Sequence, residues 1–235
     1  MILHIFNNAE EIGKAVANLI IEQVNEKPDS VLGFATGASP VPTYQSLIKA
    51  YQKGKVSFKD ITTFNLDEYC DLPVEDKNMY YTFMHENLFN HIDVKEENVN
   101  FLNGNAEDTD AECLRYDDLL TENKIDIQLL GVGRNGHIGF NEPDKYFTAA
   151  THEVVLDEST IKANARFFKN EDEVPKTAIT MGMMSIMQAK KILLVANGTA
   201  KKEIIEKAFF GPVDPMVPAS ILQLHPDVTV IFSEN

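Results

Sequence analysis

Short continuous apolar runs alternate along the chain with longer windows of helical period. The runs have the length of buried strands, whereas in the windows apolar residues recur three and four positions apart, as on one face of a helix. The expected strands are residues 2–6, 31–35, 61–66, 99–102, 125–130, 191–196 and 228–232. This alternation predicts an α/β fold: a doubly wound, mostly parallel sheet of the Rossmann-like type, flanked by helices.

Local signals place helices between these strands. Asn8 and Glu11 form a capping-box pattern, which begins a helix that ends at Pro28. Further helices are expected after the 36–40 loop, over 78–88 and 106–122, and from 198–201 through 209. Residues 146–174 are polar and lack a sustained period, so no regular element is predicted there. No repeat or linker divides the sequence, and we expect one domain over residues 1–235.

Composition narrows the classes of function. The chain has 235 residues, of which 44% are hydrophobic and 24% charged, as in an ordinary globular protein with a large core. A net charge of −15 disfavours nucleic acid as a partner, because no general basic field attracts phosphates. No window approaches the ~20 apolar residues of a membrane span. With no visible signal peptide, and with only Cys70 and Cys113, we expect a cytoplasmic protein without disulfides.

Loops rich in polar groups follow several of the expected strands. They are residues 36–40, 67–69, 131–143 and 198–201. In a parallel sheet such loops share the carboxyl edge, where α/β proteins build their sites. We therefore expect these loops to converge on one site.

The loop at 131–143 reads G-V-G-R-N-G-H-I-G-F-N-E-P. Its G-x-G-x-x-G spacing matches a dinucleotide fingerprint. That fingerprint must open a helix, which Gly139, Asn141 and Pro143 prevent here, so a nucleotide site is disfavoured.

His137 in this loop has two interpretations. It is either a histidine packed and hydrogen-bonded in a turn, or a proton shuttle that works near neutral pH. In the second case the charge of Glu142 favours the imidazolium, and Asn135 orients the ring through its amide oxygen.

Asp67 and the 36–40 loop also have two interpretations each. Asp67 ends a strand in F-N-L-D-E-Y. In the first interpretation its carboxylate is solvated or caps a helix, and in the second it serves as a general base. Gly37, Ala38 and Ser39 lie between a strand and a helix, where backbone N–H groups can hold an anion. The same residues suit a plain helix start, with Ser39 as the N-cap and Pro40 at the first helical position.

Two cations are candidates for the same edge. Lys201 lies at a strand-to-helix turn and either reaches the site or is solvated. Arg166 stands beside two phenylalanines in N-A-R-F-F, which indicates a docking loop, and its planar fork suits phosphate. No Cys/His cluster has metal-ligand spacing, and no G-x-S-x-G elbow occurs. The inventory indicates proton transfers on a small phosphorylated molecule.

Motifs along essentially the whole sequence resemble those of the glucosamine-6-phosphate deaminase family, whose superfamily also contains ribose-5-phosphate isomerase and the 6-phosphogluconolactonases. The motifs are A-T-G-A-S-P, F-N-L-D-E-Y, Y-Y-T-F-M-H, F-L-N-G-N-A, G-H-I-G-F-N-E-P, A-R-F-F, V-P-K-T-A-I-T-M-G and S-I-L-Q-L-H-P. The F-N-x-D-E-Y and G-H-I-x-F-N-E-P segments are specific for the deaminases, because lactonases share the G-H core but not the F-N-E-P ending.

The resemblance implies conversion of glucosamine 6-phosphate into fructose 6-phosphate and ammonia, with no metal or organic cofactor. It implies that His137, supported by Glu142 and Asn135, opens the sugar ring, and that Asp67 moves a proton from C2 to C1. The implied phosphate ligands are Gly37, Ala38, Ser39, Arg166 and Lys201. The segment 146–174 corresponds to the mobile lid of the family.

Two departures from the family pattern add expectations. Asn135 stands where many members carry an aspartate, so we expect Asn135→Asp to be tolerated and Glu142→Gln not to be. Larger members bind N-acetylglucosamine 6-phosphate as an allosteric activator with groups just after F-N-E-P. Here that stretch reads D-K-Y-F-T-A-A-T-H-E-V and has lost most of those groups, and the longer C-terminal extension is missing. We expect a monomer with hyperbolic kinetics and no activation by this ligand.

Two alternatives stay open. A 6-phosphogluconolactonase-like hydrolase shares the fold and the phosphate loop, although F-N-E-P and Asp67 argue against it. A non-catalytic sugar-phosphate sensor, such as the effector domain of a transcription regulator, would be joined to a helix-turn-helix. We expect none, because the acidic chain starts in the first strand, and a sensor has no need of Asp67 and His137 together.

Overall fold

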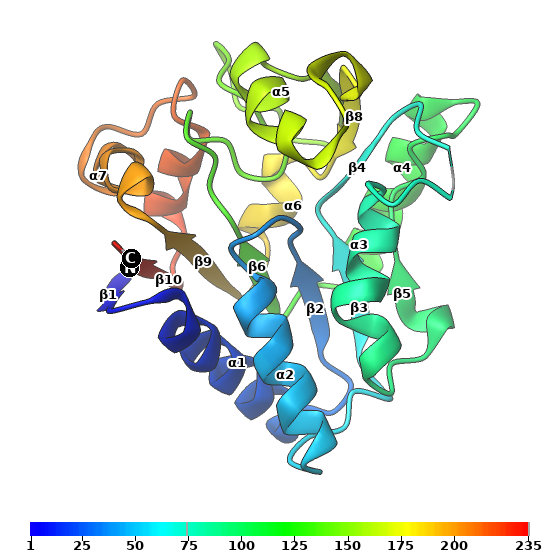
Figure 1. Cartoon of the computed structure of the whole chain (residues 1–235), viewed down its shortest axis with the longest axis vertical. Coiled ribbons are helices and arrows are strands. Elements are labelled where there is room, and N and C mark those ends of the chain that lie inside the picture. Colours follow the sequence, from blue (N-terminus) through cyan, green and yellow to red (C-terminus); the bar gives the residue numbers. More distant parts are fainter. Residues whose placement is uncertain (74, 235) are drawn as a thin grey trace.

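The computed structural model describes residues 1–73 and 75–234, and a seven-stranded sheet runs through its centre (Figure 1). The strands of this sheet are β1 (Ile2–Phe6), β2 (Val31–Phe34), β3 (Thr62–Asn65), β5 (Val99–Asn100), β6 (Ile127–Leu130), β9 (Lys191–Asn197) and β10 (Val228–Ser233). Their order is β1-β10-β9-β6-β2-β3-β5, and each neighbouring pair is parallel. The predicted α/β fold with a mostly parallel sheet is confirmed, and all the expected strands belong to this sheet.

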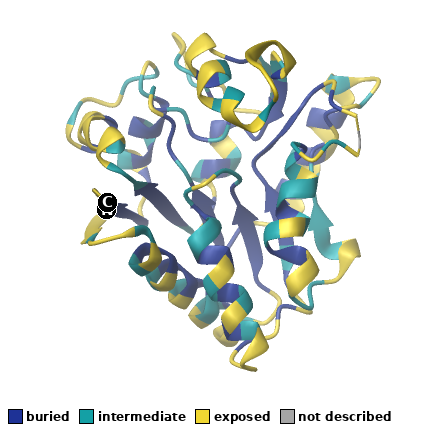
Figure 2. Cartoon of the chain, viewed as in Figure 1, coloured by how far each residue is buried: buried dark blue, intermediate teal, exposed yellow. Residues whose placement is uncertain are grey.

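Helices cover both faces of the sheet. They are α1 (Ala9–Glu26), α2 (Val41–Gln52), α3 (Tyr80–Asn87), α4 (Thr109–Glu122), α5 (Glu158–Asn164), α6 (Met183–Met187) and α7 (Lys202–Phe210). Shorter 3-10 turns are η1 (Phe89–His91), η2 (Glu96–Asn98), η3 (Ala165–Phe167), η4 (Glu171–Glu173), η5 (Thr199–Lys201) and η6 (Pro218–Leu224). Apolar residues of α1, α2 and α3 pack in one core cluster, and those of α4, α6 and α7 pack in another. The strands are buried between the two clusters, and the outer helix faces are exposed (Figure 2).

Local sequence explains how the first helix begins. The Asn8 side chain accepts a hydrogen bond from the Glu11 backbone N–H at 3.0 Å, as the capping pattern predicts. The Glu11 carboxylate reaches back one residue further than expected and accepts from the Asn7 backbone N–H at 3.1 Å. The helix ends at Glu26, before Pro28.

A second sheet of three antiparallel strands was not predicted. It consists of β4 (Asp67–Tyr69), β8 (Thr177–Thr180) and β7 (His152–Val155), in the order β4-β8-β7. Asp67 was expected in a loop that ends a strand, but it begins β4 after the single residue Leu66, and it pairs with Thr180. These strands are short, so their pairing depends on contacts distant in sequence.

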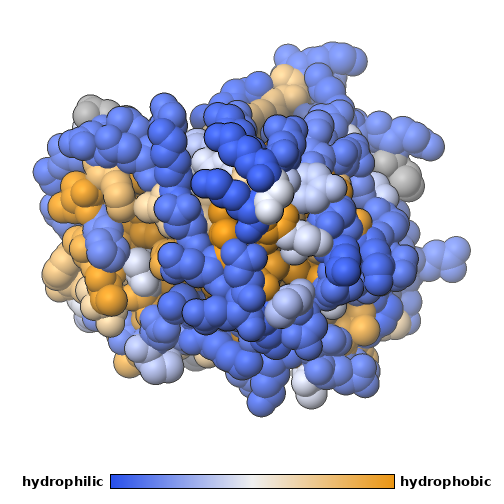
Figure 3. All heavy atoms as spheres, turned by 90° about the horizontal axis from the view of Figure 1, so that it is seen from below, coloured by the Kyte–Doolittle hydropathy of each residue, from blue (hydrophilic) through white to orange (hydrophobic). Residues whose placement is uncertain are grey.

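The segment at 146–174, where no element was predicted, contains β7, α5, η3 and η4. In Figure 1, α5 lies at the top of the molecule, beyond the carboxyl ends of β2, β6 and β9. The opposite end of the molecule, seen in Figure 3, presents a largely hydrophilic surface with separate apolar patches. Among the described residues, no helix combines the length and the apolar character needed to span a membrane.

Candidate active site

The predicted convergence of loops rests on neighbouring strands. The loops after β9, β6, β2 and β3 leave four adjacent strands of the parallel sheet, at the same edge. The glycine loop at 131–143 comes closest to β4 at Gly139. A Cβ atom on Gly139 would lie 3.5 Å from Asp67 Oδ2 and 2.9 Å from Thr180 Oγ1. The missing side chain therefore allows the loop to lie against the carboxylate.

Two more glycines shape this loop. The His137 imidazole lies against Gly133, where any Cβ atom would overlap the ring. Gly136 has φ = 92°, a conformation that L side chains rarely adopt, and Gly139 has φ = 59°. No helix follows this loop directly, which confirms the prediction that the glycine spacing does not open a helix as a dinucleotide fingerprint must.

A hydrogen-bonded network holds His137. Its Nδ1 atom lies 3.3 Å from Glu142 Oε2 and 3.4 Å from Thr160 Oγ1 of α5. Asn135 Nδ2 donates to the same Glu142 oxygen at 2.7 Å. Burial raises the pKa of the Glu142 carboxyl, but hydrogen bonding and the charge of His137, with bonds from Thr160 and Asn135, outweigh burial and lower it. The carboxylate is therefore held ionised beside the imidazole.

The expected role of Asn135 is corrected by this geometry. Its amide oxygen accepts from the His137 backbone N–H at 3.2 Å, and its amide nitrogen is bonded to Glu142. Asn135 thus fixes the loop and the carboxylate, and it does not orient the imidazole directly. The ring nitrogen has Glu142 and Thr160 as its partners.

Asp67 is a buried carboxylic acid beside a second one. Its side chain is 6% exposed, and among the described residues none donates a hydrogen bond to it. Burial raises the pKa of Asp67 well above its usual value, and the charge of Glu68 raises it further. Glu68 is fully buried and accepts backbone hydrogen bonds from Tyr69, Tyr80 and Tyr81 at 2.9 Å each. Burial raises the pKa of Glu68 to about 7, against the lowering effect of these bonds.

The loop before α2 offers backbone donors. Gly37 has φ = 91° and open space around it, and no hydrogen bond within the described chain uses the N–H groups of Gly37, Ala38 or Ser39. The interpretation of Ser39 as an N-cap is wrong. Pro40 occupies the cap position without a side-chain bond, and Ser39 Oγ donates to Asn197 Oδ1 at 3.0 Å. The hydroxyl is drawn toward β9 because the end of that strand lies beside the loop.

Cations gather on the same side of the site. Lys201 Nζ donates to the carbonyl oxygen of Val132 at 2.6 Å. Burial, together with the positive charges of Arg134 and Arg166, lowers the pKa of Lys201 to about 8. The structure thus brings Lys201 and Arg166 together, as predicted. It adds Arg134, which sequence reasoning left without a role although its place in the glycine loop was a usable signal.

The arrangement combines a buried carboxyl group, a histidine with a carboxylate partner, and three cations, and the loop with free N–H groups leaves the same sheet edge. Such a site can move protons on a small anionic molecule. Among the described residues, no group of three or more His, Cys, Asp and Glu side chains is placed to hold a metal ion.

Known proteins resemble this chain over almost its whole length. A family model described as glucosamine-6-phosphate isomerases/6-phosphogluconolactonase matches residues 7–231. A protein of Lachnoclostridium phytofermentans named glucosamine-6-phosphate deaminase is 58% identical, over 94% of each chain. One of Clostridium novyi with the same name is 50% identical, over 98% of this chain and 96% of its own.

Solved structures agree in fold. A structure described as a monomeric glucosamine-6-phosphate deaminase superposes with a TM-score of 0.96 at 46% identity, over 99% of this chain and 97% of its own. The 6-phosphogluconolactonase of Thermotoga maritima has a TM-score of 0.74 at 15% identity, over 99% of this chain and 98% of its own. The second likeness concerns the fold alone.

Proposed function

The chain belongs to the family of glucosamine-6-phosphate isomerases and 6-phosphogluconolactonases, and we propose that within it the protein is a glucosamine-6-phosphate deaminase. It converts glucosamine 6-phosphate and water into fructose 6-phosphate and ammonia. The reaction joins an aldose–ketose isomerisation to the hydrolysis of a C–N bond. The high identity to deaminases over nearly the full chain supports this assignment.

One observation carries the proposal: the Asp67 carboxylate lies against Gly139, in the same loop that carries the His137–Glu142 pair. An isomerisation needs a base at carbon and a separate proton carrier at oxygen, and a raised pKa suits the carbon base. Hydrolysis of a lactone does not require the carbon base. The geometry therefore favours the deaminase over the lactonase alternative.

The first step opens the sugar ring. His137 accepts the O1 proton of the pyranose and delivers it to O5, so that the C1–O5 bond breaks and an aldehyde forms at C1. Glu142, held ionised next to the ring, stabilises the imidazolium that exists between the two transfers. Asn135 keeps Glu142 in place through the 2.7 Å bond.

The second step moves a proton between carbons. Asp67 removes the C2 proton, and O1 takes a proton from the C2 ammonium group of the substrate, so the aldehyde becomes an enolamine with a hydroxyl at C1. The protonated Asp67 returns the proton to C1, which leaves an iminium at C2. Water adds to C2 and ammonia departs, so a ketone remains. A buried acid with a raised pKa holds the transferred proton in the intermediate state.

The phosphate group is bound at the opposite side of the site. The free N–H groups of Gly37, Ala38 and Ser39 donate hydrogen bonds to its oxygens, and Arg166 and Lys201 neutralise its charge. We assign Arg134 to the same group. The chain is then a single catalytic domain over residues 1–235, with a mobile lid over residues 146–174.

The protein is a cytoplasmic monomer without the allosteric activation of larger relatives. A similar structure is described as a monomeric enzyme. A hollow of about 390 Å³ is lined by residues 141–144, 146–148 and 152–155, among others. The lining includes Glu142, Asp144 and Glu153, and no lysine or arginine. Such a lining repels a phosphate, so we expect hyperbolic kinetics with or without N-acetylglucosamine 6-phosphate.

The test is incubation with glucosamine 6-phosphate and assay of both ammonia and fructose 6-phosphate. The Asp67→Asn and His137→Gln variants run alongside. Equal amounts of both products from the parent protein, and neither from Asp67→Asn, are the expected result. No ammonia from the parent protein, with acid release from 6-phosphogluconolactone, would instead make it a lactonase.

A further inference from the structure

Tyr69 contacts the chain on both sides of Arg166. Its hydroxyl accepts a hydrogen bond from Asn164 Nδ2 at 2.8 Å, two residues before the arginine. Its ring meets the ring of Phe168, two residues after the arginine, edge to face with centroids 5.9 Å apart. Arg166 itself lies in η3, between these two contacts, with its guanidinium 4.7 Å from the Phe167 ring centroid.

The Tyr69 ring is a fixed reference point. It is 2% exposed and packs on Tyr80 of α3 and on Phe140 of the glycine loop, with centroids 4.8 Å and 5.5 Å away. It is also the last residue of β4, the strand whose first residue is Asp67. The base and the tyrosine therefore share one short, buried segment.

The other end of α5 is attached to the proton-transfer machinery. Asp157 caps the helix by accepting from the Ser159 backbone N–H at 2.8 Å. Thr160, which is buried, lies 3.4 Å from His137 Nδ1. The helix is thus held to the glycine loop near its start and to Tyr69 at its end.

We propose that Tyr69 is a positioning residue that fixes Arg166 at a set distance from Asp67, so that the phosphate and the C2 carbon of the sugar are bound in register. This inference rests on the proposed function, because it assumes that Arg166 binds the phosphate. Tyr69 touches neither end of the substrate and acts through Asn164 and Phe168.

The hydroxyl group of Tyr69 is not needed for packing in the core. Phenylalanine would fill the aromatic cluster of Tyr69, Tyr80, Phe140 and Phe168 equally well. A buried hydroxyl is placed there at a desolvation cost, which its bonds to Asn164 and to the Tyr80 side chain offset. Because burial raises the pKa of Tyr69, the phenol stays neutral throughout the working range of the enzyme.

The test removes each partner of this bond. Tyr69→Phe keeps the ring, and Asn164→Ala keeps the helix, because alanine is the best helix former. Each variant is expected to raise KM for glucosamine 6-phosphate about fivefold, the value of one buried hydrogen bond, with little change in kcat. The double variant should show no more than the effect of Tyr69→Phe alone, since that change already breaks the bond to Asn164.

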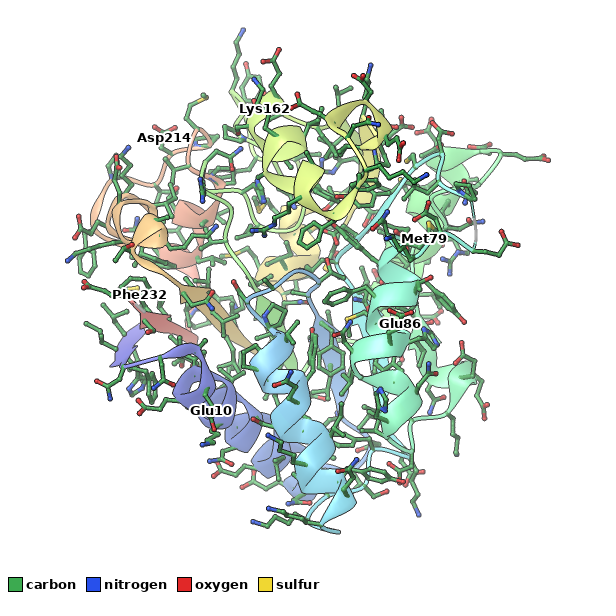
Figure 4. All side chains as sticks on the ribbon, viewed as in Figure 1. Glu10, Met79, Glu86, Lys162, Asp214 and Phe232 are labelled. Atoms are coloured by element: carbon green, nitrogen blue, oxygen red, sulfur yellow. The ribbon has the colours of Figure 1, made fainter. Side chains whose placement is uncertain are left out.

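Matched controls lie nearby. Tyr81→Phe removes a hydroxyl that bonds Glu96 at the surface of the molecule, at 3.0 Å. Lys162→Ala changes an outward residue of α5, whose side chain is 61% exposed (Figure 4). Neither control should change KM or kcat. An effect of Lys162→Ala as large as that of Asn164→Ala would mean that any damage to α5 raises KM, and it would overturn the proposal.

The decisive measurement repeats Tyr69→Phe in an Arg166→Ala protein. Arg166→Ala alone should raise KM at least about tenfold, because a charged hydrogen bond to phosphate is lost. Adding Tyr69→Phe should then change KM by less than about twofold, since nothing remains to be positioned. A further fivefold rise, or a fall in kcat alone, would show that Tyr69 acts elsewhere and would overturn the proposal. An unchanged KM in Arg166→Ala alone would instead remove the proposed phosphate role of Arg166.

Discussion

Around His137 the polar side chains are bonded to one another, whereas around Lys201 the charged side chains repel one another. In the first region, Glu142 accepts from Asn135 through its Oε2 atom, and the same oxygen faces the His137 ring. In the second region, Arg134 and Arg166 lower the pKa of Lys201, and the loop at Gly37 leaves its N–H groups unused. Only an anion satisfies the second region.

The difference shows how binding and chemistry are divided. The proton-transfer region is preorganised, so the substrate does not have to assemble it. The anion region carries cation repulsion that a dianionic phosphate relieves on binding. In the proposed reaction, the phosphate therefore supplies binding energy, and the sugar end meets groups that are already in position.

The largest effect should come from Asp67→Asn. An amide cannot take the C2 proton, so kcat should fall about 10³-fold. The folded protein raises the pKa of Asp67, so the native state holds this proton more tightly than the unfolded chain. This group therefore contributes less stability as pH rises, and at neutral pH the variant should unfold at the same or a higher temperature. Ammonia release and thermal unfolding measure the two effects.

Asp71→Asn is the matched control for this change. Asp71 is exposed and has φ = 61°, a conformation that asparagine tolerates. The Asp71→Asn variant should keep full activity. If Asp67→Asn retained activity, or if it lost much stability at neutral pH, Asp67 would be a structural residue and not the base.

The same two regions differ in how far the sequence predicts them. The strands of the parallel sheet are continuous apolar runs, so the local sequence predicts that they are buried. The loops that follow them could therefore be assigned to one edge of the sheet. His137, Glu142 and Asp67 became candidates for that edge in this way. The antiparallel sheet could not be predicted, because β4 and β7 are short and polar, and Asp67 pairs with Thr180 far along the chain.

The contacts of residues 146–174 were hidden for a similar reason. Asn164 and Thr160 face Tyr69 and His137 only because α5 folds back over the sheet edge. Ser39 is a comparable case, since the local pattern predicted a cap but a neighbouring strand provides a partner in Asn197. Contacts between distant segments decide these positions, and a local pattern carries no signal of them.

An intermediate effect should separate the two partners of His137. Glu142→Gln removes the charge that stabilises the imidazolium, so kcat should fall about 10²-fold. Asn135→Asp keeps an acceptor for the His137 backbone N–H, but it replaces the donor to Glu142 by a second carboxylate near the imidazole. Its loss should stay within about tenfold. Steady-state assays of ammonia release compare the two, and equal activity in both variants would contradict the division of roles.

The smallest effect should be a shift in pH dependence within the anion region. The pKa of Lys201 is about 8 because of burial and the charges of Arg134 and Arg166. Lys201 therefore loses its proton above about pH 8, and KM should rise there as the phosphate loses a cation. Arg134→Ala removes one of the repelling charges, so the pKa of Lys201 should increase and the rise in KM should move to higher pH. Lys202→Ala, next in sequence but exposed and paired with Glu234 at 2.8 Å, should leave the profile unchanged. The measurement is the profile of kcat/KM against pH. If Arg134→Ala shifts this profile to lower pH or leaves it in place, the cations are not coupled, and the contrast with the His137 region fails.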